Sequence, residues 1–196
     1  MNKVRIMMSN RHIHLTEADK NILFGKDYQF TVKTQITSTV ASTEETVSLE
    51  GPRGKLEHVR VLLPFRRDTQ VELLKSDCFR LGIQAPIRQS GDVEGSAALT
   101  VIGPAGTVEL KQGVIIAARH IHMDTEQAKH LGIPDRGIVS VKTEGVRGVV
   151  FENVLVRVTD HTNTVMHLDM EEGNAADLKN NDQGIIFCQG TEHYAE

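Results

Sequence analysis

The sequence lacks the features that mark secreted, disulfide-stapled and membrane-spanning proteins. Its 196 residues include two cysteines, Cys78 and Cys188, which form neither a Cys-x-x-Cys pair nor a disulfide framework. No apolar run approaches the length of a membrane span, and the polar residues 1–8 are too few for a signal peptide. These absences fit a reducing compartment, so we expect a cytoplasmic protein without a membrane partner.

Positive charge is also scarce. The 22 lysines and arginines are outnumbered by 26 acidic residues, the formal net charge is −4, and there is no long basic run. Because nucleic acids are bound through basic surfaces, we expect no nucleic-acid partner. The sequence contains no Gly-x-Ser-x-Gly motif, no P-loop and no dinucleotide-binding fingerprint. Any chemistry is therefore expected to depend on a metal.

The tetrapeptide Arg-His-Ile-His is present twice, at Arg11–His14 and at Arg119–His122. Side chains alternate along a strand, so the two histidines of each copy lie on one face. Two imidazoles on one face provide half of a transition-metal site. A single pair arises easily by chance and is usually structural, whereas a second identical copy in a matching context favours metal binding.

A second similarity extends the repeat. The segment 56–61 resembles 151–156, and continuing without a gap places Glu72 opposite His167. Each half then offers a His-x-His pair and one further ligand, which suits two ions that each keep a position open for substrate. Ligation rich in nitrogen favours zinc, cobalt or nickel. The six predicted ligands are His12, His14, Glu72, His120, His122 and His167.

Two further residues are candidates for binding an anion. Arg66 stands a few residues before Glu72, and a guanidinium can contact two oxygens of a phosphate. From spacing alone, a solvated arginine in a polar turn is an equally good interpretation. Ser90 begins a Gly-rich loop, Ser90–Ser96, that could offer a hydroxyl and backbone amides, although most such loops are only connectors.

The sequence predicts many short strands and few helices, which is typical of barrels or a sandwich. Helices are expected to begin at Thr16 and at Asp124, directly after each His pair. Shorter helices are predicted over 76–81 and 171–178, and tight turns at Gly51–Gly54 and Gly103–Gly106. The predicted strands are 36–40, 46–49, 58–63, 70–74, 98–102, 108–110, 113–117, 138–141, 149–158, 165–168 and 184–188.

Ordered motifs along nearly the whole chain point to a known family. They are Ser9–Leu15, Gly51–Gly54, Val59–Leu62, Pro64–Arg66, Thr69–Glu72, Leu81–Pro86, Ser90–Asp92, Arg119–Met123 and Met166–Asp169. With these motifs the chain resembles the PduL-type phosphotransacylases, or phosphate propanoyltransferases. The resemblance implies a mainly β fold of two interlocked β-barrels, related by an approximate internal repeat and capped by short helices, with the active site between them. It implies one catalytic unit over residues 1–196, with a central barrel of about 30–115 and a second barrel of about 1–29 plus 116–196.

The resemblance also implies an activity and roles for particular residues. Members interconvert acyl-CoA plus phosphate with acyl phosphate plus coenzyme A (CoA), and two zinc ions held by the six ligands above would serve a direct attack of phosphate on the thioester. An acetyl or a propanoyl group would be transferred. Arg66 would bind the phosphate as the catalytic arginine. The residues at the family's CoA contacts are Ser9, Lys33, Arg60, Leu62, His167 and Asn174, of which Lys33 lies in a variable stretch.

Other interpretations stay open at this point. The ligand set would also suit a dinuclear hydrolase of phosphate esters or thioesters, or a non-catalytic metal-binding protein. Family members are often dimers, so a homodimer is compatible with the resemblance. The N-terminal extension that directs some members into microcompartments is not evident, and we therefore expect a free cytoplasmic enzyme.

Overall fold

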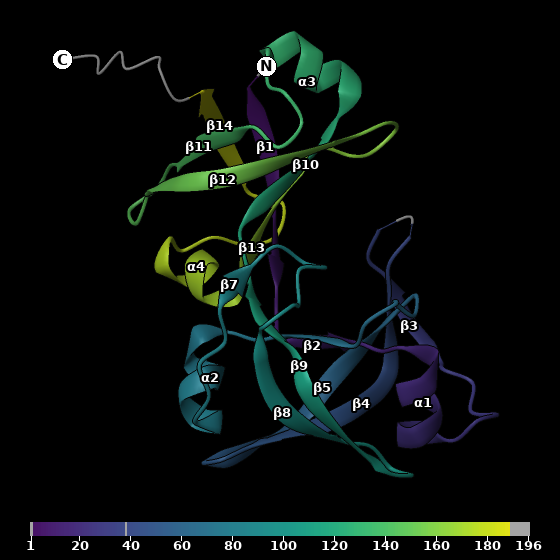
Figure 1. Ribbon diagram of the computed structural model, residues 1–196. Coiled ribbons are helices and arrows are strands. Elements are labelled where there is room, and N and C mark those ends of the chain that lie inside the picture. The colour runs from purple at the N-terminus through teal and green to yellow at the C-terminus, as the bar shows by residue number, and fades with distance from the viewer. Residues whose placement is uncertain (1, 38, 189–196) are drawn as a thin grey trace. The chain divides into compact units, whose positions relative to one another are not determined.

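A computed structural model describes residues 2–37 and 39–188 (Figure 1). The chain divides into two compact units, which are considered separately below. Unit 1 comprises the described residues 2–9 and 118–188, and unit 2 those of Asn10–Ala117. Within the described residues, none of the helices is sufficiently long and apolar to span a membrane.

Unit 2 contains a closed ring of six strands. Its strands and helices are β2 (His12–His14), α1 (Glu17–Phe24), β3 (Val32–Gln35), β4 (Ala41–Gly51), β5 (Gly54–Leu63), β6 (Gln70–Glu72), α2 (Lys75–Leu81), β7 (Ile87–Arg88), β8 (Ala97–Ile102) and β9 (Thr107–Ala117). The ring runs β2-β5-β4-β8-β9-β6 and returns from β6 to β2. The two remaining strands pair with members of the ring, β3 with β4 and β7 with β9.

Unit 1 is a closed barrel of six strands. Its strands and helices are β1 (Lys3–Ser9), β10 (His120–Asp124), α3 (Thr125–Leu131), β11 (Ile138–Thr143), β12 (Val150–Thr159), β13 (Val165–Asp169), α4 (Met170–Ala175) and β14 (Gln183–Cys188). The ring runs β10-β12-β11-β14-β1-β13 and returns from β13 to β10.

The two rings have the same order and the same strand directions. Each His strand pairs in parallel with one neighbour, β5 or β12, and antiparallel with the other, β6 or β13. Each ring also contains the strand that precedes, in sequence, the His strand of the other unit. Strand β1 of unit 1 precedes β2 of unit 2, and β9 of unit 2 precedes β10 of unit 1. The predicted mainly β fold of two barrels with few short helices is confirmed.

The division between the units differs from the predicted one over residues 10–29. The prediction placed this segment with the C-terminal half, but β2 and α1 lie in unit 2. The reason is strand pairing, because β2 hydrogen-bonds on both sides to strands of the central segment, β5 and β6. The chain leaves one unit for the other at Ser9–Asn10 and at Ala117–Ala118, directly before each Arg-His-Ile-His.

The helices begin where their caps predict. The Thr16 hydroxyl accepts a hydrogen bond from the backbone N–H of Asp19 at 3.0 Å, and the Asp124 carboxylate accepts one from Glu126 at 3.0 Å. These bonds satisfy N–H groups that a helix leaves without an internal partner, so α1 and α3 start one residue later. Both helices therefore follow the His strands at once.

Two Gly-Pro-x-Gly turns pack against helix ends in unit 2. A Cβ atom at Gly51 would lie 2.4 Å from the carbonyl oxygen of Leu81 in α2, and one at Gly103 would lie 2.4 Å from that of Leu23 in α1. The same carbonyls accept N–H donors from the turns, Arg53 to Leu81 at 3.0 Å and Ala105 to Leu23 at 2.9 Å. Only glycine allows this approach of backbone to backbone.

Some predicted elements differ in extent. The strand predicted over 36–40 is wrong, because the N–H groups of Ile36 and Thr37 both donate to the Val40 carbonyl in a turn after β3; residue 38 lies outside the described residues. The two strands predicted over 108–110 and 113–117 form one strand, β9, whose pairing with β8 shifts register between Leu110 and Val114. The helix predicted over 171–178 ends at Ala175.

Candidate metal centres

In unit 2 the first predicted ligand set comes together around β2. His12 lies opposite Glu72 in the antiparallel pairing of β2 with β6, and His14 follows on the same face. Ligand atoms of the three residues all lie within 4.8 Å of one another. The two imidazole rings are 5.2 Å apart and nearly perpendicular, and His14 is only 2% exposed. We call His12, His14 and Glu72 the unit 2 triad.

In unit 1 the second set has the same arrangement around β10. His120 lies opposite His167 in the antiparallel pairing of β10 with β13. The ring centroids are 5.0 Å apart for His120 and His122, 5.1 Å for His120 and His167, and 5.4 Å for His122 and His167. The three side chains are half-buried. We call His120, His122 and His167 the unit 1 triad.

The first histidine of each triad is oriented through its Nδ1 atom. His12 Nδ1 lies 2.8 Å from the carbonyl oxygen of Asn10, and His120 Nδ1 lies 3.0 Å from that of Ala118. A carbonyl only accepts hydrogen bonds, so in each ring Nδ1–H donates, and in the neutral form of the ring Nε2 carries the lone pair. The backbone two residues earlier thus leaves Nε2 as the ligand atom in both units.

The unit 2 triad fits a transition metal. His14 Nδ1 is buried and, within the part of the chain that the structure describes, has no hydrogen-bond partner. Burial first, then the nearby His12 and Arg66, lowers the pKa of His14 to about 3, so the ring is neutral at pH 7 and able to coordinate. Two imidazoles and one carboxylate are a common zinc set.

Glu72 is held as a carboxylate. Its Oε1 atom accepts hydrogen bonds from Gln70 Nε2 at 2.6 Å and from Ser90 Oγ at 2.8 Å, whereas Oε2 lies 3.4 Å from His12 Nε2. Burial alone would raise the pKa of Glu72, but His12 and the Ser90 hydrogen bond lower it below its ordinary value. The same contact raises the pKa of His12, against the effect of burial. Glu72 thus presents Oε2 to the other ligands.

In the unit 1 triad, His122 is also neutral at pH 7. Burial, then His120 and Arg157, lower its pKa to about 4. Neutral imidazole is the form that binds a metal, so acid rather than neutral pH would compete with binding.

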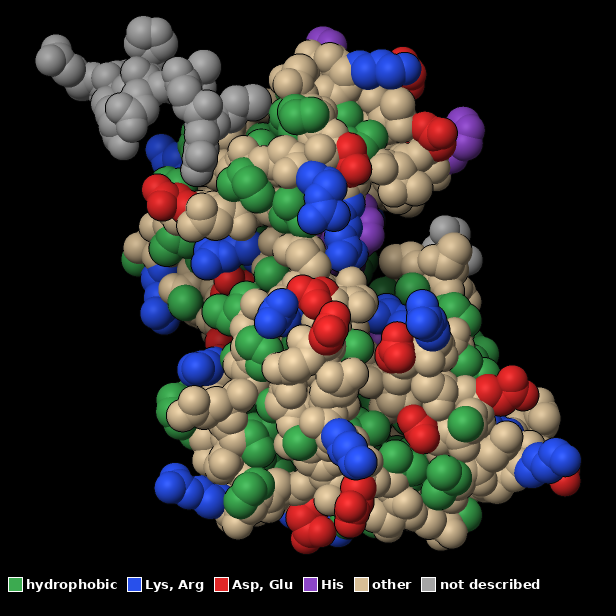
Figure 2. All heavy atoms as spheres, viewed as in Figure 1, with side chains coloured by type: hydrophobic (Ala, Val, Ile, Leu, Met, Phe, Trp, Pro, Cys, Tyr) green, Lys and Arg blue, Asp and Glu red, His purple; other side chains and the backbone are tan. Residues whose placement is uncertain are grey.

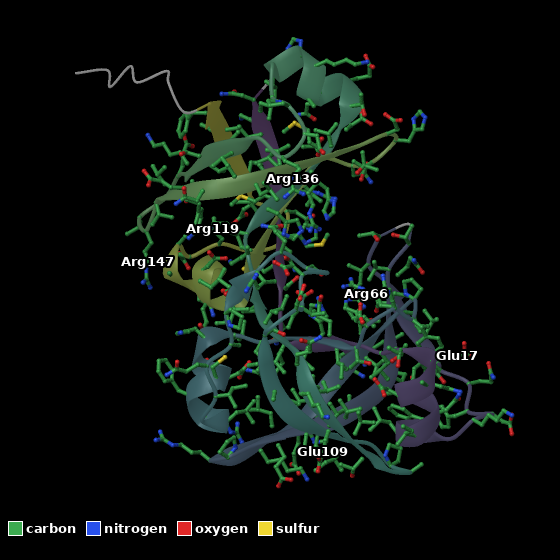
Figure 3. All side chains as sticks on the ribbon, in the orientation of Figure 1. Glu17, Arg66, Glu109, Arg119, Arg136 and Arg147 are labelled. Atoms are coloured by element: carbon green, nitrogen blue, oxygen red, sulfur yellow. The ribbon has the colours of Figure 1, made fainter. Side chains whose placement is uncertain are left out.

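Arg66 is connected to the unit 2 triad through Ser90. Its backbone N–H donates to the Leu15 carbonyl at 2.8 Å, and its guanidinium donates to Ser90 Oγ at 3.0 Å. Figure 3 labels its half-buried side chain, while the neighbouring Arg67 is exposed. The two predicted anion-binding residues therefore contact each other, and one of them contacts a predicted metal ligand.

Sequence reasoning missed Gln70. This residue is 1% exposed, its side-chain amide donates to Glu72 and to Ser90 (2.9 Å), and its carbonyl accepts the N–H of Gly91 at 2.7 Å. Its position two residues before Glu72, on the same strand face, was the available signal. Gln70 joins the predicted anion loop to the triad.

The residues predicted to contact CoA are divided between the units. In unit 2, Lys33 is exposed and pairs with Glu44 at 3.1 Å, Arg60 donates to the carbonyls of Thr43 and Glu44, and Leu62 is buried. In unit 1, Ser9 ends β1 opposite Asp169, His167 is in the triad, and Asn174 is exposed on α4. On the face shown in Figure 2, acidic and basic side chains are interspersed.

Comparison with known proteins gives one consistent result. A family model described as phosphate propanoyltransferase matches residues 5–179. A Thermotoga maritima protein named phosphate propanoyltransferase is 45% identical over 89% of this chain and 84% of its own length. Proteins of the same name from Rhodopseudomonas palustris and Rhodobacter capsulatus are each 46% identical, over 92% and 90% of this chain and 80% and 83% of their own lengths.

Proposed function

The chain belongs to the phosphate propanoyltransferase family and is an acyltransferase, and from this premise we propose that it moves a short acyl group, acetyl or propanoyl, between CoA and inorganic phosphate. The substrates would be acyl-CoA and phosphate, and the products acyl phosphate and free CoA. The observation that supports the proposal is the hydrogen-bonded series from Arg66 through Ser90 to Glu72, since it joins the proposed phosphate-binding side chain to a proposed metal ligand.

We propose two zinc ions per chain, one on each triad. The buried Nδ1 of His14, the matched Nδ1 contacts of His12 and His120, the close ligand atoms of the unit 2 triad and the neighbouring imidazole rings of the unit 1 triad support this assignment. Bound zinc would supply positive charge against the negative charge that develops on phosphate and on the thioester oxygen. Three protein ligands per ion are typical of catalytic rather than structural zinc.

Arg66 would orient the nucleophile. Its planar guanidinium can donate two parallel hydrogen bonds to phosphate, and Ser90 fixes one end of that group. The Ser90 hydroxyl and the loop after it would offer further donors to the same anion. Gln70 would hold this loop at a fixed position relative to Glu72, through its hydrogen bonds to both.

The reaction conserves atoms and charge without an acyl-enzyme. An oxygen of hydrogen phosphate forms a bond to the thioester carbonyl carbon, the carbon–sulfur bond breaks, and CoA leaves as a thiolate that takes up the proton lost by the phosphate. Ser9, Lys33, Arg60, Leu62, His167 and Asn174 are proposed to contact CoA. The cytoplasmic location and the homodimer stay predictions.

A thiol-release assay tests the activity. Purified, metal-analysed protein is given acetyl-, propanoyl- or butanoyl-CoA with and without phosphate. We expect CoA release to require phosphate and to yield an equal amount of acyl phosphate. Release without phosphate would instead identify a hydrolase, and metal binding without any release would identify a non-catalytic metal protein.

Replacement of Arg66 tests the proposed phosphate site. Arg66→Ala should lower turnover by at least ~10²-fold, because a donor to the transition state is lost. Arg67→Ala is the matched control, since its side chain is exposed and next in sequence. Near-normal turnover of Arg66→Ala would remove Arg66 from the mechanism.

A further inference from the structure

The arginine before each His pair makes an ion pair that neither the repeat nor the proposed chemistry uses. Arg11 Nε lies 2.7 Å from Asp77 Oδ2 in unit 2, and Arg119 Nε lies 3.0 Å from Glu172 Oε1 in unit 1. Both guanidiniums use the same nitrogen, and both side chains are 34% exposed. Arg119 is labelled beside α4 in Figure 3.

The two acidic partners occupy equivalent positions. Asp77 is the third residue of α2 and Glu172 the third residue of α4. These helices start shortly after the strands that carry the third ligands, β6 and β13. Each carboxylate also accepts a backbone N–H just before its helix, from Leu74 at 3.1 Å in unit 2 and from Asp169 at 3.2 Å in unit 1.

The register explains what these contacts restrain. His12 is opposite Glu72 and His120 is opposite His167 in antiparallel pairs, so each arginine stands one residue beyond the ligand pair. The backbone bonded to each carboxylate lies two residues past the third ligand, at Leu74 and Asp169. Each carboxylate therefore connects the chain before the first histidine to the chain after the third ligand.

We propose that Arg11–Asp77 and Arg119–Glu172 are positioning pairs, which hold the first histidine and the third ligand of each triad at the separation that a metal requires. The proposal rests on the two zinc sites of the proposed function. The repetition of the contacts favours positioning over coincidence. The acids differ, aspartate in one unit and glutamate in the other, yet the guanidinium contact and the backbone contact are both present twice.

The size of the expected effect separates this role from a purely structural one. Arg119–Glu172 is partly exposed on both sides, so its loss should change stability little, whereas Asp77 is buried and loss of Arg11 should lower stability as well. Loss of a residue that orients a metal ligand lowers metal affinity by about 10–100-fold. In unit 1 the loss of a positioning pair should therefore affect metal binding far more than unfolding, and in unit 2 the zinc affinity of the folded Arg11 variant distinguishes the two roles.

The test measures each site by itself. In a His14→Ala background, which disables the unit 2 triad, Arg119→Ala is compared with its parent by zinc titration against a chelator and by the visible spectrum of cobalt-loaded protein. In a His122→Ala background, Arg11→Ala is compared in the same way. We expect affinity to fall about 10–100-fold and the cobalt bands to shift or weaken. Glu172→Gln and Asp77→Asn should act in the same direction, because the backbone acceptor is kept and the charge is lost.

Matched controls are Lys129→Ala in unit 1 and Lys55→Ala in unit 2, which remove ion pairs with Glu126 and Glu57 elsewhere in the same units. They should leave affinity and spectrum unchanged. If an alanine variant does not fold, Arg119→Gln and Arg11→Gln serve instead. Unaltered zinc affinity and cobalt spectrum in the folded arginine variants would overturn the positioning role alone. Failure of the wild-type protein to bind zinc or cobalt would overturn the zinc sites and this inference with them.

Discussion

The two triads share a framework and differ in charge. Both have an Arg-His-Ile-His strand, perpendicular imidazoles and a third ligand opposite the first histidine. The proposed third ligand is the carboxylate of Glu72 in unit 2 and the imidazole of His167 in unit 1. A divalent ion together with its three ligands would therefore have a net charge of about +1 at the unit 2 triad and about +2 at the unit 1 triad.

This difference suggests a division of labour. The buried unit 2 triad, with an anionic ligand, is expected to hold its metal more firmly, since a carboxylate compensates a cation taken from water. A metal on the half-buried unit 1 triad would keep more positive charge for a substrate oxygen. A repeated backbone has thus been combined with two different electrostatic environments.

Removal of one histidine from each triad should give the largest effect. His14→Ala and His122→Ala are each expected to reduce bound zinc from two ions to one and to lower turnover by ~10³-fold or more, because Lewis-acid stabilisation is worth several kcal/mol. Metal analysis and thiol release measure the two outcomes. His130→Ala, an exposed histidine on α3, is the control. Full activity of either variant with one bound zinc ion would show that the altered triad is not needed for turnover.

A glycine in a Gly-Pro-x-Gly turn of unit 2 should be more important for the free energy of unfolding than a glycine in an open position of unit 1. Gly103→Ala should destabilise the protein by about 2–3 kcal/mol, because the new methyl group would overlap the Leu23 carbonyl. Gly132→Ala in unit 1 should cost only about 1 kcal/mol, since open space surrounds it and the cost is its positive φ. Denaturant unfolding measures both. Equal losses would show that the close turn-to-helix approach contributes nothing.

Acid should destabilise the metal-free protein through His14 and His122. Their folded pKa values, about 3 and about 4, lie below the ordinary 6.5, so unfolding takes up protons as the pH falls below 6.5. The free energy of unfolding should fall by up to about 1.4 kcal/mol per pH unit for each histidine. The raised pKa of His12 acts above pH 6.5 and does not oppose this trend.

Unfolding midpoints measured from neutral pH to about pH 5 test this prediction. His14→Gln should flatten the dependence, and its difference from wild type isolates His14, because other titrating groups such as Glu172 are present in both. An equally steep dependence in His14→Gln would contradict the prediction.

Exchange of the third ligands should give a smaller effect. Glu72→His would make the unit 2 triad neutral and His167→Glu would make the unit 1 triad anionic. We expect zinc affinity to fall at the first site and rise at the second, each by roughly 10-fold, as charge compensation changes. Competition titration on single-site backgrounds measures this. If the unit 2 triad still binds zinc more tightly than the unit 1 triad after the exchange, burial and not ligand charge determines the difference in affinity.

Much of the candidate site could be predicted because its signals are local. Alternation along a strand places His12 with His14, and the gapless repeat places Glu72 and His167 in matching positions, where the structure pairs each with the first histidine of its triad. The helix starts at Thr16 and Asp124 follow from a cap next to the His strand. Each inference needs only a few neighbouring residues.

Other parts depend on contacts between distant residues. Arg11 and Asp77 are 66 positions apart, and nothing near either one identifies the other. Gln70 looks like any polar strand residue until the loop at Ser90 and Gly91 packs against it. The boundary near residue 30 was misplaced because the partners of β2 come from later in the chain.

The sequence by itself determined the two His-x-His strands and the family and predicted a third ligand for each strand, since short periodic patterns and ordered motifs carry that information. Tertiary structure alone decided which strands close each barrel, which atoms of Glu72 and the histidines face one another, and which acids pair with Arg11 and Arg119. The physical reason is that strand pairing and burial bring together groups that are far apart along the chain, and charge and hydrogen bonding act only once they are close.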